Sequence, residues 1–228
     1  MNEMLGKHRV VDLSKKLYPG QENRRLAVRR YFVEKTGDYH SEMDLMSHLG
    51  THVESPYHYK DQWPDILQLP VTNFVGRGVL LRLDDIAARA WIRAADLDKA
   101  DRGRVREGDV VLLTSPYHSE PFIFNADDQR PNLGEDAAKW LAAKRVKAVG
   151  WGDSVAIEHD VEAGKIFHEI LMPQNVTFIE VMQNLDQLQV DMFLIVFMPL
   201  PIAGLDSCPV RVVAIEGIPG FRSEERHV

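Results

Sequence analysis

The sequence predicts a mixed α/β fold built as a single domain. Its 228 residues fit one large domain, and no repeat, low-complexity segment or linker divides them. Several short apolar runs have the branched residues of buried strands. One helix-patterned segment leads directly into a strand-patterned one, which is an α-then-β order. We therefore expect strands and helices to share one core across residues 1–228.

The N-terminal half shows strand and turn signals. Val10–Ser14 reads as a short strand, and Tyr18-Pro19-Gly20 as a turn, because proline presets φ and glycine permits positive φ. Residues 21–45 are polar and mixed, which indicates strand and loop facing solvent or a partner. Gly78–Leu83 is a strand candidate by its branched apolar residues. The alanine-rich segment Ile86–Lys99 predicts a helix or helical turns.

The C-terminal half contains the clearest helix. Val110–Thr114 is an apolar run of buried-strand type. Leu133–Arg145 places apolar residues on one helical stripe, and Val146–Gly152 follows as a strand. The remaining strand candidates are Val176–Met182, Phe193–Met198 and Val210–Ile215. The charged tail Ser223–Val228 is expected to fray.

The composition excludes several classes of function. Apolar residues make up 45% and charged residues 27%, which is ordinary for a soluble globular protein. The net charge of −7 is negative, whereas a protein that binds nucleic acid usually carries an excess of positive charge. No apolar run reaches the roughly 20 residues that a bilayer requires, and no signal-peptide core follows Met1. The single cysteine, Cys208, excludes an internal disulfide and is interpreted as packed. We expect a cytoplasmic protein without nucleic-acid or membrane partners.

A dense cluster of possible metal ligands lies between His48 and His58. The run also contains His52 and Glu54, and imidazole and carboxylate are usual ligands of divalent metals. A helix is disfavoured because Gly50 and Pro56 interrupt the run. All four candidate ligands have even numbers, so a strand would direct them to one face.

A straight strand cannot bring these four side chains to one ion. It would separate the ends of the run by roughly 33 Å, whereas each ligand atom must lie about 2.0–2.2 Å from the metal. The chain must therefore bend, and Gly50 and Pro56 are the expected places. The alternative is that the histidines are scattered surface or satisfied core residues. Three histidines and a carboxylate of matching parity favour a loop-borne metal site.

The same run resembles a family signature. His48-Leu49-Gly50-Thr51-His52-Val53-Glu54-Ser55-Pro56-Tyr57-His58 is similar to the His-x-Gly-Thr-His-x-Asp-x-Pro-x-His motif of the cyclase-like metal-dependent hydrolases. That family contains the bacterial kynurenine formamidases (arylformamidases) and the isatin hydrolases. Further similar segments are Val11–Ser14, Tyr18–Gly20, Leu133–Leu141, Val149–Ser154 and Gly204–Arg211. The resemblance implies a curved or barrel-like mixed sheet with flanking helices, in a homodimer or homotetramer.

The resemblance also implies a set of site residues. One ion would be held by His48, His52 and Glu54, and a second, where present, by Glu54, His168 and Glu180. The metal would be zinc or manganese, with one or two ions per chain. Glu54 departs from the family's usual aspartate by one methylene.

Two further roles follow from the resemblance. His58 would donate and accept protons, and Tyr18 would contact the substrate. From the residues alone, Glu180 lies in an apolar run, where burial without a partner is costly. His159 and Glu169 are interpreted as solvated surface residues.

These residues predict a hydrolase of a small-molecule carbonyl compound. A divalent metal lowers the pKa of water from about 15.7 to about 7 and polarises a carbonyl oxygen, so an amide, formamide or lactone is the natural target. A histidine with an ordinary pKa near 6.5 suits the proton transfers. The alternatives are a cyclase or lyase on the same site, and a non-enzymatic protein with a structural metal.

Overall fold

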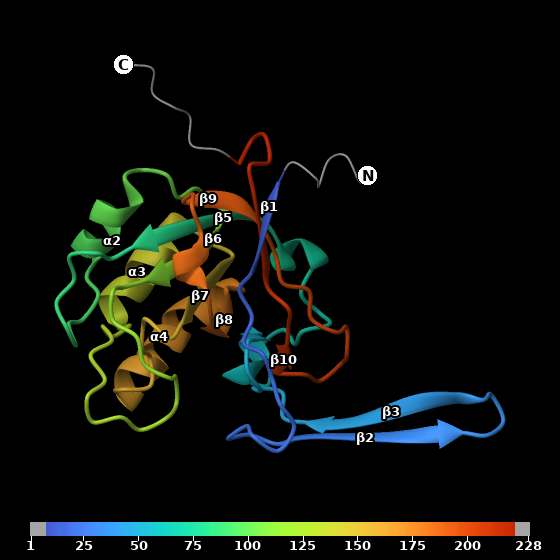
Figure 1. The fold of residues 1–228 in the computed structure, drawn as a ribbon. Coiled ribbons are helices and arrows are strands. Elements are labelled where there is room, and N and C mark those ends of the chain that lie inside the picture. The colour runs from blue at the N-terminus through green and yellow to red at the C-terminus, as the bar shows by residue number, and fades with distance from the viewer. Residues whose placement is uncertain (1–7, 222–228) are drawn as a thin grey trace.

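A nine-stranded mixed sheet forms the centre of the molecule. The computed structural model describes residues 8–221, and the strands are ordered β1-β11-β9-β5-β6-β7-β8-β4-β10 (Figure 1). These strands are β1 (Arg9–Asp12), β4 (His52–Glu54), β5 (Val75–Arg82), β6 (Val110–Thr114), β7 (Ala148–Gly152), β8 (Thr177–Met182), β9 (Met192–Val196), β10 (Ser207–Pro209) and β11 (Val213–Glu216). The sheet is curled, so the expected curved mixed sheet is confirmed.

The middle of the sheet is parallel, and its strands β6, β7 and β8 are buried along their whole length. β5, β6, β7 and β8 run parallel, with Val110 opposite Gly78 and Ala148 in the register. Val110 and its three apolar successors in β6 are completely buried. A strand covered on both faces must be apolar at every position, which explains its continuous apolar run.

Three helices cover one face of the sheet among the described residues. They are α2 (Ala94–Asp101), α3 (Glu135–Lys144) and α4 (Val161–Leu171) (Figure 1). Leu141 of α3 and Phe167 of α4 pack in one apolar cluster with Val111 of the sheet. A second cluster, which includes Leu112 and Phe193, fills the other face.

A two-stranded arm projects away from this body. Its strands are β2 (Leu26–Val33) and β3 (Asp38–Leu45), which pair only with each other (Figure 1). The expectation of exposed strand and loop over residues 21–45 is therefore confirmed. Short 3-10 segments complete the structure: η1 (Pro56–His58), η2 (Val71–Phe74), η3 (Met172–Gln174) and η4 (Leu185–Gln187).

The structure differs from the expected elements at three places. The expected helical segment Ile86–Lys99 is helical only from Ala94 onward, in α2, whereas residues 86–93 form turns and a bridge and the Ile92 N–H donates to Asn132 O at 3.0 Å. Helix α4 was not expected; Asp160 caps it by accepting from the Ala163 N–H at 2.9 Å. Of the expected last strand Val210–Ile215, only residues 213–215 are strand, in β11, whereas β10 ends before it at Pro209. The predicted frayed tail, Ser223–Val228, lies outside the described residues.

The helices are short relative to a bilayer. Within residues 8–221, none has the length and apolar character that crossing a membrane requires.

Candidate metal site

Two paired strands bring three of the expected ligands to one face. In β4, His52 and Glu54 are two residues apart, so both side chains lie on the same side of the strand. β8 pairs antiparallel with β4, and Glu180 lies directly opposite His52. The three side chains are almost wholly inaccessible to solvent.

Bends on either side of β4 add His48 and His58. Gly50 has φ +58°, in the left-handed region, and turns the chain between His48 and His52. Pro56 begins η1, which ends at His58. The chain therefore bends at the two expected places. The Arg24 guanidinium also donates to the His48 carbonyl, which fixes this turn to the base of the arm.

The backbone supplies the orientation of two imidazoles. His52 Nδ1 lies 2.7 Å from Gly50 O, and His168 Nδ1 lies 2.7 Å from Gly164 O in α4. Because a carbonyl only accepts, both Nδ1 atoms must donate. In the neutral rings, both Nε2 atoms then present a lone pair to Glu54, at 3.5 and 3.7 Å. This is the usual arrangement of metal-binding histidines.

The distances in this cluster fit a metal centre. Two ligand atoms that each lie about 2.1 Å from an ion are at most about 4.2 Å apart. His48 Nδ1 lies 3.2 Å from His52 Nε2 and 2.8 Å from Glu54 Oε1. His52 Nε2 lies 3.7 Å from Glu180 Oε2. All of these separations fall within the limit.

One oxygen of Glu54 is left without a partner. Within residues 8–221, Glu54 Oε2 is buried and accepts no hydrogen bond. A buried carboxylate oxygen without a partner is costly, and a cation would satisfy it. The residues present therefore fit a divalent metal with nitrogen and oxygen ligands.

The two buried carboxyl groups have opposite pKa shifts. Burial raises the pKa of Glu54, but the imidazoles of His168, His48 and His52 outweigh it and hold that pKa well below its usual range. Burial raises the pKa of Glu180 well above its usual range, and the nearby charge of Glu54 raises it further. Two carboxyl groups of this kind beside several imidazoles are typical of a functional site.

Asp206 is a member of the cluster that sequence reasoning missed. Its Oδ2 accepts from His48 Nε2 at 2.7 Å and lies 3.4 Å from His58 Nδ1. A carboxylate behind a metal-binding imidazole fixes the orientation of the ring. Asp206 precedes β10, which pairs with β4. The sequence offered one signal for Asp206, since it lies in the segment Gly204–Arg211, which is similar to a segment of the family.

Backbone strain lies next to Glu180. Val181 has φ +56°, which is rare for a β-branched residue. The Thr51 hydroxyl donates to Val181 O at 2.7 Å, and the β7–β8 register shifts between Gly150 and Gly152. A Cβ on Gly152 would lie 1.8 Å from Met182 O. The bulge therefore needs glycine at this position and sets the direction in which β8 presents Glu180.

The structure does not bring Tyr18 into the cluster. Tyr18 lies in the expected turn, where Gln21 N–H donates to Tyr18 O at 3.0 Å, and its side chain is exposed. A small cavity near this turn is lined by Lys15, Glu22 and His48, but not by Tyr18. Of the other interpretations, Glu169 and His159 are both exposed as expected, and the ring of His159 also bonds to Asn132 and Asp128.

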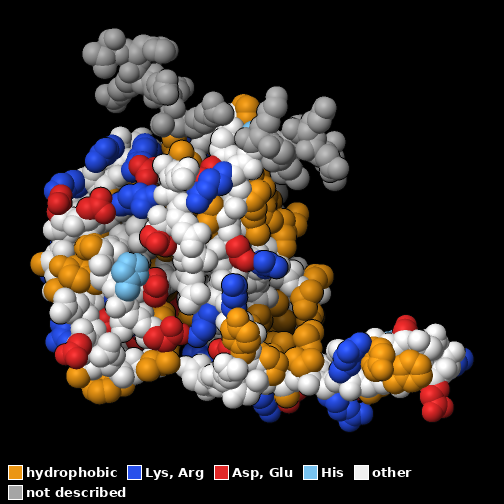
Figure 2. Space-filling view, in the orientation of Figure 1, with side chains coloured by type: hydrophobic (Ala, Val, Ile, Leu, Met, Phe, Trp, Pro, Cys, Tyr) orange, Lys and Arg blue, Asp and Glu red, His pale blue; other side chains and the backbone are white. Residues whose placement is uncertain are grey.

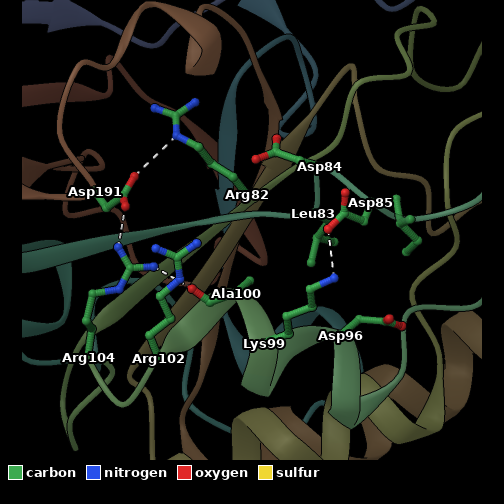
Figure 3. Close-up of a pocket in the computed structure, with 11 residues that line it drawn as sticks. Arg82, Leu83, Asp84, Asp85, Asp96, Lys99, Ala100, Arg102, Arg104 and Asp191 are labelled. Atoms are coloured by element: carbon green, nitrogen blue, oxygen red, sulfur yellow. Dashed lines mark hydrogen bonds and ion pairs between the residues drawn. The ribbon is translucent and has the colours of Figure 1, made fainter.

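A second polar pocket lies beside α2 and has a different character (Figure 3). Asp191 pairs with both Arg82 and Arg104, and Lys99 pairs with Asp85 at 2.7 Å. These paired charges, without histidine, are typical of a structural ion-pair network rather than of a metal site.

Comparisons with known proteins identify the family of this chain. The model of the cyclase family, described as "Putative cyclase", matches residues 11–159. An isatin hydrolase of Roseibium aggregatum is 25% identical over 194 residues, which cover 76% of this chain and 73% of the relative. A kynurenine formamidase of Maricaulis maris is 26% identical over 179 residues, covering 77% of this chain and 80% of the relative.

Solved structures share the fold over nearly the whole chain. A structure described as a potential metal-dependent hydrolase with cyclase activity has TM-score 0.71 and 25% identity, covering 93% of this chain and 100% of its own. An isatin hydrolase bound to the product analogue thioisatinate has TM-score 0.76 and 16% identity, covering 93% and 94%. Because the family model spans more than half of the sequence and includes the His48–His58 run, this chain belongs to the cyclase family.

Proposed function

We propose that this protein is a metal-dependent hydrolase that cleaves an amide, formamide or lactone of a small molecule. One observation carries the proposal: Glu54 Oε2 is buried without a hydrogen-bond partner, and the His52 and His168 Nε2 atoms face the two oxygens of this carboxylate while their ring hydrogens lie on Nδ1. Relatives named isatin hydrolase and kynurenine formamidase support the reaction class. In this proposal the small-molecule carbonyl compound is the only partner besides further copies of the chain.

The proposed ligand roles rest on the family resemblance, and the close grouping of His48, His52 and Glu54 supports those of the first ion. His48, His52 and Glu54 would hold one divalent ion, and their ligand atoms lie within 4.8 Å of one another. Glu54, His168 and Glu180 would hold a second where two are present. A bound ion of this kind lowers the pKa of water to about 7 and polarises a carbonyl. Zinc or manganese suits these ligands.

His58 would move the protons. Burial lowers its pKa, and the nearby His48 and His168 lower it further against the charge of Glu54. A neutral imidazole at neutral pH can take a proton from the attacking water. The water oxygen adds to the carbonyl carbon, the C–N or C–O bond breaks, and His58 returns the proton to the leaving atom. Asp206 would hold the ring in place through Nδ1.

The proposal has three further parts: a substrate contact, a cellular location and an assembly state. Tyr18 would contact the substrate from its turn beside the cavity near His48. We further propose a cytoplasmic homo-oligomer, either a dimer or a tetramer.

The test measures hydrolysis of N-formylkynurenine, isatin and simple lactones by metal-loaded and metal-free protein. Loaded protein should turn over at least one of them, and chelator should abolish the activity. His58→Gln should lose at least about 100-fold in turnover while it retains the metal. The control, His40→Gln on the exposed arm, should keep full activity. Turnover by metal-free protein would contradict the proposal.

The product distinguishes the alternatives. Hydrolysis places solvent oxygen in the product, whereas cyclisation or elimination on the same site does not. A bound metal with four protein ligands and no open position would instead favour a structural role.

A further inference from the structure

The cavity beside His48 contains a cation without an acidic partner. It has a volume of about 20 Å³, and two basic side chains line it, Lys15 and Arg24. The Lys15 ammonium pairs with Glu120 at 2.5 Å and with Glu22 at 3.8 Å. Within residues 8–221, by contrast, the Arg24 guanidinium forms no ion pair, although it is half-buried. The charge of Arg24 is therefore available to an anion from outside the chain.

Contacts on two sides fix the Arg24 guanidinium beside the metal-ligand run. Its Nη1 donates to the His48 carbonyl, and its Cζ lies over the Phe122 ring, 5.3 Å from the ring centroid. A guanidinium has several N–H donors, and among the described residues only the His48 carbonyl accepts from this one. The other donors of a group that is already held in place are thus free to bind a ligand.

The loop that carries Phe122 is held in place by neighbouring segments. Phe122 has φ +60°, which is rare for a bulky residue. Its N–H donates to Glu158 Oε1 at 3.0 Å, and Glu120 of the same loop is held by Lys15. Strained backbone that is held this firmly is typical of ligand clamps. The ring therefore keeps its place over Arg24 and limits the access of water to the guanidinium.

A carboxylate is the anion that fits this group. The planar fork of a guanidinium matches the two oxygens of a carboxylate. The cavity of about 20 Å³ holds little more than one oxygen-sized group, which disfavours the bulkier phosphate or sulfonate. The surface as a whole does not favour anions, because the net charge is −7 and basic and acidic side chains are interspersed over the face shown in Figure 2. Recognition must then come from the local contact with Arg24.

We infer that Arg24 binds a carboxylate of the substrate, so that the protein hydrolyses carbonyl compounds that also carry an acidic group. The inference rests on the proposed function, because His48 would hold the ion that activates the water. His48 and Arg24 line the same cavity, so the carboxylate lies a few bonds from the carbonyl that reacts. An ortho-acylaminobenzoate has this spacing, which makes it a suitable probe.

The first test measures binding, which does not depend on turnover. Metal-loaded protein is titrated by calorimetry with 2-aminobenzoate and with its neutral isostere 2-aminobenzamide. Wild type should bind the acid more tightly, and Arg24→Gln should reduce the ratio of the two affinities about 30-fold, a typical value for a hydrogen-bonded charge contact. This ratio isolates the charge, because a disturbed His48 turn would weaken the binding of both probes alike.

Two further variants accompany this measurement. Arg24→Lys keeps the charge without the planar fork and should recover part of the ratio. Arg25→Gln removes the neighbouring guanidinium, which pairs with Asp44 of the arm at 3.2 Å, and should keep the ratio of wild type. The same ratio in Arg24→Gln and wild type, or an equal loss in Arg25→Gln, would overturn the inference.

The second test compares the hydrolysis of 2-formamidobenzoate and 2-formamidobenzamide. Wild type should have the higher kcat/KM for the acid, and Arg24→Gln should reduce this preference about 30-fold. Hydrolysis of both compounds by wild type without preference for the acid would contradict the inference alone. If the loaded protein hydrolyses neither these compounds nor other amides and lactones, the proposed function fails, whereas the affinity ratio still decides the role of Arg24.

A third comparison tests the cover over the guanidinium. Phe122→Ala should lower the affinity ratio about 3-fold, because the ring no longer shields the charge contact from water. Phe124→Ala is the control, since Phe124 lies on the same loop and is 95% exposed, and it should leave the ratio unchanged. Equal ratios in the two variants would contradict the enclosed position of Arg24.

Discussion

Asp206 is the residue whose removal tests the site geometry best. The Asp206→Asn variant keeps the shape of the side chain but loses its charge. The carboxylate accepts from His48 Nε2 at 2.7 Å and lies 3.4 Å from His58 Nδ1. The shorter bond orients a proposed metal ligand, and loss of such a bond typically costs about 10–100-fold in metal affinity. The longer bond orients the proposed proton carrier, so turnover should fall about 10-fold further.

The assay has two readouts for this variant. Metal affinity is measured by calorimetric titration, and turnover by the rate at saturating metal and substrate. Because Asp206 raises the pKa of His58, its loss should also move the acidic limb of the pH–rate profile to lower pH. The control is Asp191→Asn, which breaks two arginine contacts far from the histidines and should leave metal affinity unchanged. Equal metal affinity and turnover in Asp206→Asn and wild type would refute the positioning role.

Three further variants test other parts of the structure. Gly50→Ala should weaken metal binding about 10-fold and lower the free energy of unfolding by about 1–3 kcal/mol, because Gly50 has φ +58° and a Cβ there would lie 2.5 Å from Leu17 Cδ2. Unchanged metal affinity and stability would contradict this prediction. Glu180→Gln should reduce the bound metal, measured by elemental analysis, from two ions to one if the second site exists; an unchanged two ions would exclude Glu180 as a ligand. Asp128→Asn should lower the free energy of unfolding by about 2–3 kcal/mol at pH 7, because Asp128 is the ion-pair partner of the buried Arg130. Burial alone would raise the pKa of Asp128, but the hydrogen bonds from Arg130 hold this pKa below its usual range. The stability difference between wild type and Asp128→Asn should therefore shrink as the pH falls below about 3.9. A difference that stays constant with pH would contradict the role of this ion pair.

The local geometry of the metal-ligand run could be predicted from the sequence. Strand parity placed His52 and Glu54 together, and the rise of a strand required bends on either side of them. Gly50 and Pro56 occupy those bends because one permits positive φ and the other presets φ for a 3-10 turn. These features depend on neighbours a few residues apart, which sequence patterns report well.

Contacts between distant segments could not be derived from the pattern alone. His168 and Glu180 were connected to the run only through the family resemblance, and their placement depends on how α4 packs on the sheet. Asp206 lies 158 residues from His48, and no local pattern indicates that contact. Helix α4 was missed because Gly164 interrupts its apolar stripe, although Asp160 offered a capping signal.

The alternation of apolar residues along the β2–β3 arm was only partly visible in the sequence. Residues 21–45 are mixed in composition, and the alternation becomes clear only when the register pairs Phe32 with Tyr39 and Val28 with Met43. One strand alone gives a weak alternation because Arg30 interrupts it. The paired register shows a continuous surface.

The central claim is that the buried cluster around Glu54 binds a divalent metal. The most direct measurement is a crystal structure of manganese-loaded protein with anomalous scattering data. The account predicts an anomalous peak within about 2.0–2.3 Å of His52 Nε2 and a Glu54 oxygen, and no peak there in His52→Ala. No peak at this cluster in saturating metal, or an equal peak in the variant, would contradict it.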